Sequence, residues 1–387
     1  MNMRWSLKEL YSSFESEELK NDMEKLKECI EVFKKWSKES LTDKENAGEK
    51  IETYINSIRS LYSHYSRLSE FAELSMSVDV KNEKAAKISE TIDNRITELT
   101  EAEVNFQKWL YSLENFEQLI EQSQLIKEHE FFLRELRGKS KYLLSEKEEV
   151  AIAKLINTGS NAWSKLQNVV SSTLLVDMEV EGEKKQLPLP VVRNMAYDKD
   201  SNLRKSAYEA ELKAYKKIEE SSAACLNGIK GEVITISKMR GYDSLLEQTL
   251  INSRLDMETL EAMLSAIKES LPQFRAFYRK KAEVLGHKNG LPFYDLFAPV
   301  GNVDMKFTYE DAKDFVVSNF STFSKKLGDF AENAFDKNWI DAEPREGKRG
   351  GAFCSNLHVI GESRILSNFN GSFSNVATLA HELAILT

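Results

Sequence analysis

The chain has 387 residues, of which 41% are hydrophobic and 30% are charged. A chain of this length and composition holds enough apolar residues for two domains, each with its own core. The formal net charge is −9, and an acidic surface repels nucleic acid phosphates and anionic lipid headgroups. The expected partners therefore include neither nucleic acids nor membrane surfaces.

The cysteines and the apolar runs indicate a cytoplasmic protein. Cys29, Cys225 and Cys354 are far apart, odd in number and form no CxxC pair, which favours a reducing compartment. The first residues contain no apolar core of a signal peptide. No run of about 18 apolar residues occurs, so we expect no membrane span.

Long helices are predicted for most of the chain. Only 6 prolines and 16 glycines, the main helix breakers, are spread over its length. In the first part, apolar residues recur at helical spacing in residues 51–68 and form one stripe: Ile51, Tyr54, Ile55, Ile58, Leu61, Tyr62, Tyr65 and Leu68. The sequence therefore indicates a mainly α fold.

The helical pattern breaks once, at residues 174–192. Apolar and acidic residues alternate from Leu174 to Val180, which predicts a strand. Gly182 indicates a turn, and the run from Leu187 to Val192, with its two prolines, suggests an edge strand or an extended arm. We therefore expect a helical N-terminal region at residues 1–180 and a second domain at residues 181–387.

The second region returns to helices. Asp256 is a candidate N-cap, and Leu260, Met263, Leu264 and Ile267 form the expected buried face of the helix that follows. Pro272 is expected to end that helix. Gly286 is a candidate C′ residue of the next helix, and His287 beside it is expected at the surface.

The C-terminal part changes character. Residues 350–360 and 362–373 read as short β-like runs that form a small hairpin or sheet. A helix follows, with Ser374 as its candidate N-cap. It carries His381 and Glu382, the start of the H-E-x-x-H pattern in which two histidines one turn apart bind zinc and the glutamate activates water. The second histidine is missing, because position 385 is Ile385, so the pair alone is a weak signal.

Three separated segments make this pair more specific. The segment "NFNGSFSNVATLAHEL" (residues 368–383), together with "REGKRGGAFC" and "LPFYDLFAPVG" before it, resembles the oligoendopeptidase F family of zinc metallopeptidases. The helical run at residues 204–267 is similar to the family as well. This resemblance implies a multi-helix oligopeptidase fold with a small β element before the active-site helix, around a channel that admits short unfolded peptides.

The resemblance also implies roles for individual residues. His381 would be a zinc ligand and Glu382 the general base. The extended segment before the helix would lie along the bound peptide, through Phe369, Asn370, Gly371, Ser372 and Phe373. The second histidine is absent, and the family's glutamate ligand further downstream is not present either. We therefore expect that the catalytic domain is incomplete, that this chain holds no stoichiometric zinc and that it cleaves no peptides.

The match to the family stops after Leu383, which suggests a change of reading frame. Gly-His-Ser-Tyr written GGC CAT TCT TAC, followed by C, becomes GCC ATT CTT ACC when one G is lost, and this encodes the Ala-Ile-Leu-Thr of residues 384–387. The DNA sequence tests this hypothesis. Without the helices that would follow, we expect exposed apolar surface around Leu379 and Leu383.

Other interpretations stay open at this point. The chain could be a non-catalytic helical protein that binds peptides or a partner, or a fragment that pairs with a separately encoded C-terminal half. Cys354 is read as a small buried residue and His358 as a structural one. The positive residues Arg345, Lys348 and Arg349 either steer a peptide carboxylate or lie on a solvated loop.

Overall fold

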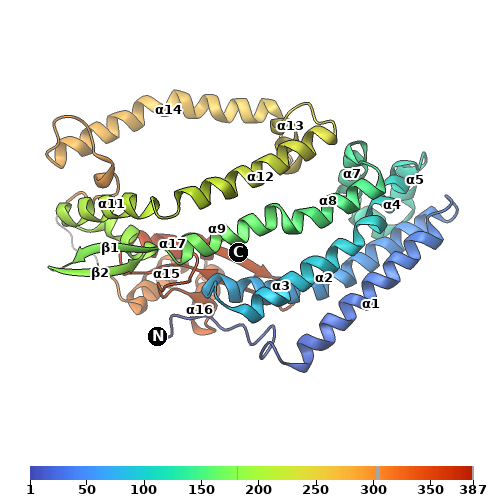
Figure 1. The fold of residues 1–387 in the computed structure, drawn as a ribbon, viewed down its shortest axis with the longest axis horizontal. Coiled ribbons are helices and arrows are strands. Elements are labelled where there is room, and N and C mark those ends of the chain that lie inside the picture. The colour runs from blue at the N-terminus through green and yellow to red at the C-terminus, as the bar shows by residue number, and fades with distance from the viewer. Residues whose placement is uncertain (181, 302–305, 386–387) are drawn as a thin grey trace.

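The computed structural model describes residues 1–180, 182–301 and 306–385. With 69% of its residues in helices and 7% in strands, it confirms the mainly α prediction (Figure 1). The N-terminal region consists of helices α1 Glu17–Ser40, α2 Ala47–Val78, α3 Glu83–Ile96, α4 Thr100–Tyr111, α5 Phe116–Gln122, α6 Gln124–Glu128, α7 Glu130–Lys139, α8 Glu146–Thr158 and α9 Ser160–Ser172, with short 3-10 turns η1 Thr97–Leu99 and η2 Ser140–Tyr142.

The core of this region lies between α1, α2 and α4. The predicted stripe on α2 faces it, with Ile51, Tyr54 and Leu68 almost completely buried. The ring of Tyr54 stacks on that of Phe106 of α4 with 3.5 Å between centroids. Tyr62 is the member of the stripe that stays exposed.

A hairpin follows the N-terminal helices, as predicted. Strands β1 Leu175–Val180 and β2 Glu183–Pro188 pair antiparallel, with Leu175 opposite Pro188. The expected extended run beyond Pro188 is wrong, because α10 Leu189–Asn194 begins there. Pro190 lies in its first turn, where a missing N–H costs nothing. Residue 181, at the predicted domain boundary, lies outside the described part of the chain, and the division at 180 stays a prediction.

The next helices form an arm along one side of the molecule (Figure 1). It consists of η3 Met195–Tyr197, α11 Ser201–Tyr215, α12 Glu219–Met239, α13 Leu245–Ser253, α14 Met257–Val284 and η4 Phe293–Asp295. Asp256 caps α14, because its side chain accepts from the Thr259 N–H at 2.7 Å. Gly286 follows the end of α14 with φ +84°, as predicted for a C′ residue.

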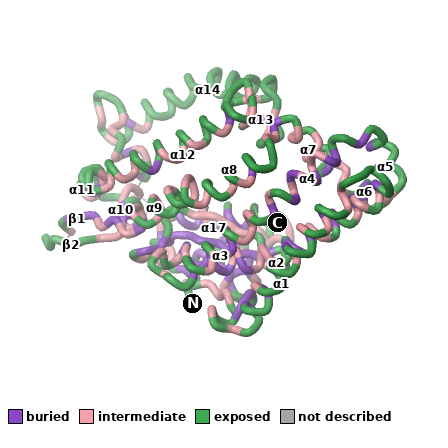
Figure 2. The backbone as a smooth tube through the Cα atoms, turned by 45° about the vertical axis from the view of Figure 1, so that its right-hand side comes forward, coloured by how far each residue is buried: buried purple, intermediate pink, exposed green. Residues whose placement is uncertain are grey.

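Two expectations for α14 are wrong. The helix continues through Pro272 to Val284. Its expected buried face is exposed, with Met263, Leu264 and Ile267 between 41% and 50% accessible. Figure 2 shows α14 exposed along nearly its whole length. Ala282 is the one buried residue in α14, so the described residues leave its apolar side largely uncovered.

The C-terminal part joins two helices, a small sheet and a final helix. These are α15 Tyr309–Phe323, α16 Lys325–Asp336, β3 Ile340–Asp341, β4 Phe353–Leu357, β5 Glu362–Leu366 and α17 Phe373–Ile385. The strand order is β3-β5-β4, with β5 parallel to β3 and antiparallel to β4. The predicted hairpin is therefore present, and β4 is an edge strand.

Candidate functional site

Helix α17 carries the His-Glu pair, and a tight turn fixes where the helix begins. Gly371 has φ +90°, and a Cβ on it would lie 2.7 Å from the Phe307 carbonyl oxygen, so only glycine fits. Its own carbonyl accepts from the Phe307 N–H at 2.9 Å. The helix begins at Phe373, one residue before the predicted cap Ser374, and the Ser372 hydroxyl accepts from the Asn375 N–H.

One face of α17 is buried in the C-terminal core. Val376, Leu379 and Leu383 are almost inaccessible and pack with residues of α15 and α16. This corrects the expectation that Leu379 and Leu383 would be exposed, because α15, α16 and the sheet already cover them. Residues 386 and 387, which end the suspected shifted segment, lie outside the described residues.

The two residues of the pair differ in their surroundings. His381 is exposed, whereas Glu382 is only 8% accessible and lies against the sheet near Cys354. Burial and the neighbouring Glu382 carboxylate raise the pKa of the Cys354 thiol. Ile385, one turn beyond His381, is exposed as well, so the missing second ligand would stand beside the first.

The donor set of this chain does not fit a zinc ion. A catalytic zinc takes three protein ligands and keeps one open position. Across residues 1–180, 182–301 and 306–385, no group of three or more His, Cys, Asp or Glu side chains is placed to hold a metal. His381 is thus a single candidate ligand without companions on the described chain.

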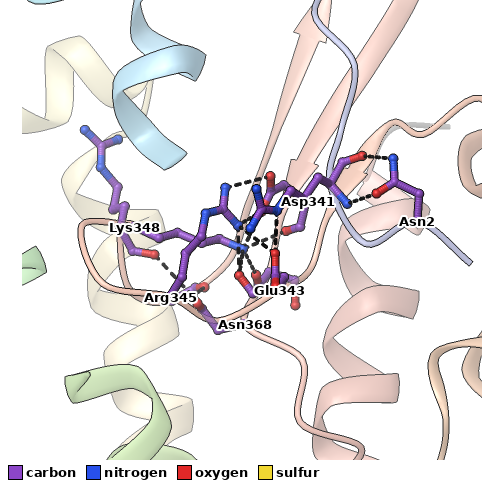
Figure 3. Close-up of polar contacts among 10 residues, drawn as sticks. Asn2, Asp341, Glu343, Arg345, Lys348 and Asn368 are labelled. Carbon is purple, nitrogen blue, oxygen red and sulfur yellow. Dashed lines mark hydrogen bonds and ion pairs between the residues drawn. The ribbon is translucent and has the colours of Figure 1, made fainter. Parts of the chain in front are cut away.

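Of the three positive residues in the loop before β4, Arg349 is exposed, whereas Lys348 and Arg345 are held by internal contacts (Figure 3). Lys348 is fully buried, lies 2.7 Å from an Asp341 oxygen and donates to the carbonyls of Asp341, Glu343 and Ser367. Burial lowers its pKa to about 8. Arg345 makes a two-bond pair with the same Asp341 carboxylate. Both side chains therefore hold the loop in place and are not free to meet a peptide carboxylate.

Asn368 ties this loop to the segment that leads into α17. Its Nδ2 donates to the carbonyls of Arg349 and Gly351, at 3.2 and 3.0 Å, and its own carbonyl accepts from Asn194. These bonds fix the amide orientation, so Oδ1 is the acceptor. That oxygen is buried and has no hydrogen-bond partner in the described part of the chain.

A cavity of about 1310 Å³ brings the three sequence segments together. The loop before β4 contributes residues 348–352, the segment at η4 contributes Phe293, Tyr294 and Phe297, and α17 contributes Ser374, Asn375 and Thr378. Residues of helices α10 and α11 line the same cavity. His381 and Glu382 do not line this cavity. On the same helix, His381 follows Thr378 by less than one turn, and Glu382 follows it by about one turn.

Sequence reasoning missed the wall that α11 supplies. Tyr208, Glu211 and Tyr215 line the cavity, and Glu211 accepts from Arg193 of α10 at 2.8 Å. The spacing of these three positions, three and four residues, places them on one face of a helix. This helix face, with polar and aromatic residues in place of apolar ones, is the feature from which the sequence could have indicated a cavity wall.

The expected peptide-contacting segment has mixed surroundings. Phe369 is buried and packs on the Tyr309 ring, at 5.7 Å between centroids. Gly371 is buried, Ser372 is half-buried and forms a bridge with Lys306, and Asn370 and Phe373 are exposed. A role of this segment in peptide binding stays a prediction.

Two further histidines and the three cysteines have different surroundings. His287, expected at the surface, instead lies 2.6 Å from the buried Asp295 carboxylate, because the turn after Gly286 folds back toward η4. His358 is exposed in the turn between β4 and β5. All three cysteines are free thiols. Within the described residues, no helix is both long and apolar enough for a membrane span.

Comparison with known proteins finds the family that the three sequence segments resemble. Residues 194–383 match the family model described as peptidase family M3, and residues 111–174 match the model described as oligopeptidase F. Similar proteins include oligopeptidase PepF of Bacillus subtilis (strain 168), 24% identical over 98% of this chain and 56% of that protein. An oligoendopeptidase F homolog of Borreliella burgdorferi is 24% identical over 98% of this chain and 63% of its own length.

Solved structures share the fold. PZ peptidase A with inhibitor 2 has a TM-score of 0.73 at 18% identity and covers 95% of this chain and 61% of its own. Oligoendopeptidase-F from Enterococcus faecium has a TM-score of 0.65 at 17% identity and covers 83% of this chain and 66% of its own. The chain thus spans less than two thirds of the length of these relatives.

Proposed function

Because the chain belongs to the oligoendopeptidase F group of peptidase family M3, we propose that it binds short, unfolded peptides in an extended form. Peptides of this kind are the substrates that the resemblance implies for the family's zinc-dependent endopeptidases. The site is the surface of β4 and α17 next to the cavity. The acidic surface and the free thiols support a cytoplasmic protein.

One observation carries this proposal: an edge strand runs directly out of the cavity wall. Residues 350–352 line the cavity and β4 begins at Phe353. Among the described residues, β4 pairs with β5 alone, so no strand occupies its second edge. Strand addition binds peptides through the main chain and therefore tolerates different sequences.

His381 and Glu382 are proposed as the ligand and the base that the family's chemistry uses. In an intact site a zinc ion would activate the water that attacks the peptide bond. Ile385 stands where a second histidine is needed, and the described residues supply no donor group of three. We therefore propose that this chain alone binds peptides without cleaving them and holds well under one equivalent of zinc.

Calorimetric titration of the purified chain with an unfolded octapeptide tests this proposal. We expect saturable 1:1 binding that is unchanged by a chelator, unchanged peptide on subsequent chromatography, and little zinc by elemental analysis after dialysis. Absence of binding would contradict the peptide-binding proposal. Cleavage that the chelator abolishes, together with about one equivalent of zinc, would instead contradict the proposed inactivity.

A folded protein of similar composition provides the matched control ligand. We expect it not to compete with the octapeptide, because its backbone groups are already paired within its own structure. Competition by a folded protein would show that the surface recognises side chains rather than an extended backbone.

A further inference from the structure

The sequence contains three Asn-Gly pairs, at residues 227–228, 289–290 and 370–371. In such a pair the backbone nitrogen of the glycine can attack the side-chain carbonyl carbon of the asparagine, and the glycine has no side chain that hinders the approach. This attack closes a five-membered ring and expels ammonia. The surroundings of each pair therefore decide whether its asparagine is chemically stable in the folded chain.

The first pair is protected by a helix and by packing. Asn227 and Gly228 lie in the interior of α12, so the Gly228 N–H belongs to the helical hydrogen-bond ladder. Gly228 also lies against Trp163, since a Cβ on the glycine would be 2.5 Å from the indole nitrogen. Ring closure at Asn227 therefore requires local opening of α12, which costs free energy.

The third pair is held by the turn before α17. The Asn370 side-chain oxygen accepts from the Ser372 N–H at 3.3 Å, and the Asn370 N–H donates to the Asn375 side chain at 2.9 Å. Gly371 is buried against the Phe307 carbonyl. Neighbouring groups thus fix both reacting residues, and ring closure would have to break these contacts.

The second pair has none of these restraints. Asn289 and Gly290 lie in the loop between α14 and η4, and both are exposed. Within the described residues, neither of them makes a hydrogen bond or an ion pair. Gly290 has φ +95°, and a Cβ on it would meet no atom within 4 Å. The reacting groups of this pair are therefore free to approach each other in the folded chain.

The loop is anchored on both sides of this pair. The His287 N–H donates to the Ala282 carbonyl at 2.8 Å, and the His287 ring lies 2.6 Å from the Asp295 carboxylate. The Asp295 N–H donates to the Pro292 carbonyl at 3.0 Å. Asn289 thus lies at the tip of a loop whose ends are fixed, so its conversion requires no unfolding of the neighbouring elements.

We propose that Asn289 is a site of spontaneous deamidation in the folded chain. The Gly290 nitrogen forms a bond to Cγ of Asn289, the bond from Cγ to the side-chain nitrogen breaks, and ammonia leaves with the proton of the Gly290 N–H. Water then opens the resulting succinimide at one of its two carbonyl groups. The products are aspartate and isoaspartate at position 289, each with one new negative charge two residues after His287. This modification is independent of peptide binding.

Incubation of the folded chain at neutral pH, followed by proteolysis and mass spectrometry, tests the proposal. The measured change is the replacement of the side-chain NH₂ by OH at each of the three asparagines. We expect conversion of Asn289 to be at least about tenfold faster than that of Asn227, which corresponds to about 1.4 kcal/mol of protection by the helix. It should also be faster than that of Asn370. Equal or faster conversion of either of the other two overturns the inference.

The chain unfolded in guanidinium chloride is the matched control, because unfolding removes the contacts that protect the other two pairs. We expect the three rates to become similar. If Asn289 keeps the same lead in the unfolded chain, the neighbouring sequence rather than the fold sets its reactivity, and the inference is wrong. The products test the ring step in the same samples. Isoaspartate is expected, whereas aspartate alone would show direct hydrolysis by water and overturn the mechanism.

Two variants connect the modification to its charge. On ageing, the unaltered chain should yield an acidic form that ion-exchange chromatography separates. Asn289→Gln should suppress this form, since glutamine would have to form a larger ring. Asn227→Gln, at an exposed position of α12, should leave it unchanged. An acidic form that persists in Asn289→Gln and disappears in Asn227→Gln would overturn the assignment to the loop.

Discussion

The carboxylate of Asp295 lies 2.7 Å from the guanidinium of Arg204, and both side chains are almost completely buried. His287 contacts the second oxygen of the same carboxylate. This cluster joins α11 to the segment after α14, and that segment carries Phe293 and Phe297. The aromatic wall of the cavity is thus held in place by a buried ion pair at the base of the arm.

Asp295→Ala should destabilise the chain strongly, because it leaves Arg204 buried without its partner. Removing one member of a buried pair costs about 3–5 kcal/mol. Urea unfolding measures the loss. Asp336→Ala is the control, since Asp336 pairs with Lys313 at the surface, and exposed pairs contribute about 0–1 kcal/mol. Equal losses of unfolding free energy in the two variants would show that the buried cluster does not stabilise the fold more than a surface pair does.

Ile385→His should increase zinc affinity, because residue 385 is exposed one turn beyond His381 and a second imidazole would reach the same ion. We expect tighter binding by tenfold or more, which corresponds to about 1.4 kcal/mol. Competition with a zinc indicator dye provides the measurement. Ile385→Ala is the control that removes isoleucine without adding a donor. Equal zinc affinity in both variants would argue against His381 as a ligand.

Gly371→Ala should destabilise the turn before α17. Its positive φ and the contact with the Phe307 carbonyl together should cost more than about 1 kcal/mol. Gly361→Ala, in the turn between β4 and β5, also has a positive φ but meets no atom within 4 Å. Thermal unfolding should therefore show a larger loss at position 371. A smaller loss there would mean that the turn relaxes to admit a Cβ.

The buried Lys348 should make stability depend on alkaline pH. Its folded pKa of about 8 lies below the ordinary value of 10.5, so between these values the unfolded chain binds more protons than the folded chain. Stability from this group therefore rises with pH, by about 1–2 kcal/mol from pH 8 to 9.5. Urea unfolding of the chain and of Lys348→Met across this range measures the difference. The same pH slope in both would contradict the assignment.

Periodic features could be predicted from the sequence, because one short stretch contains all the information they need. The stripe on α2, strand β1, the β4–β5 hairpin and the helix with His381 are such features. The α14 face shows the limit of this reasoning. Met263, Leu264 and Ile267 mark the apolar side of the helix, but periodicity does not state whether another element covers that side.

The cavity could not be predicted because it depends on contacts between distant segments. Phe293, Asn368 and Thr378 share one cavity although they belong to three separate parts of the sequence. Each family-like segment was recognisable, but the space that they enclose depends on the sheet order and on how α11 packs. The same reason explains His287, whose partner Asp295 is eight positions away and follows no helical spacing.

Hydrogen–deuterium exchange of the chain with and without an unfolded octapeptide tests the central claim, that the free edge of β4 binds an extended peptide. We expect slower exchange in fragments that contain Phe353 to Leu357, because a paired peptide supplies new backbone hydrogen bonds. Fragments of the exposed α14 should not change. Unchanged exchange at β4 under saturating peptide, or protection confined to α14, would contradict the claim.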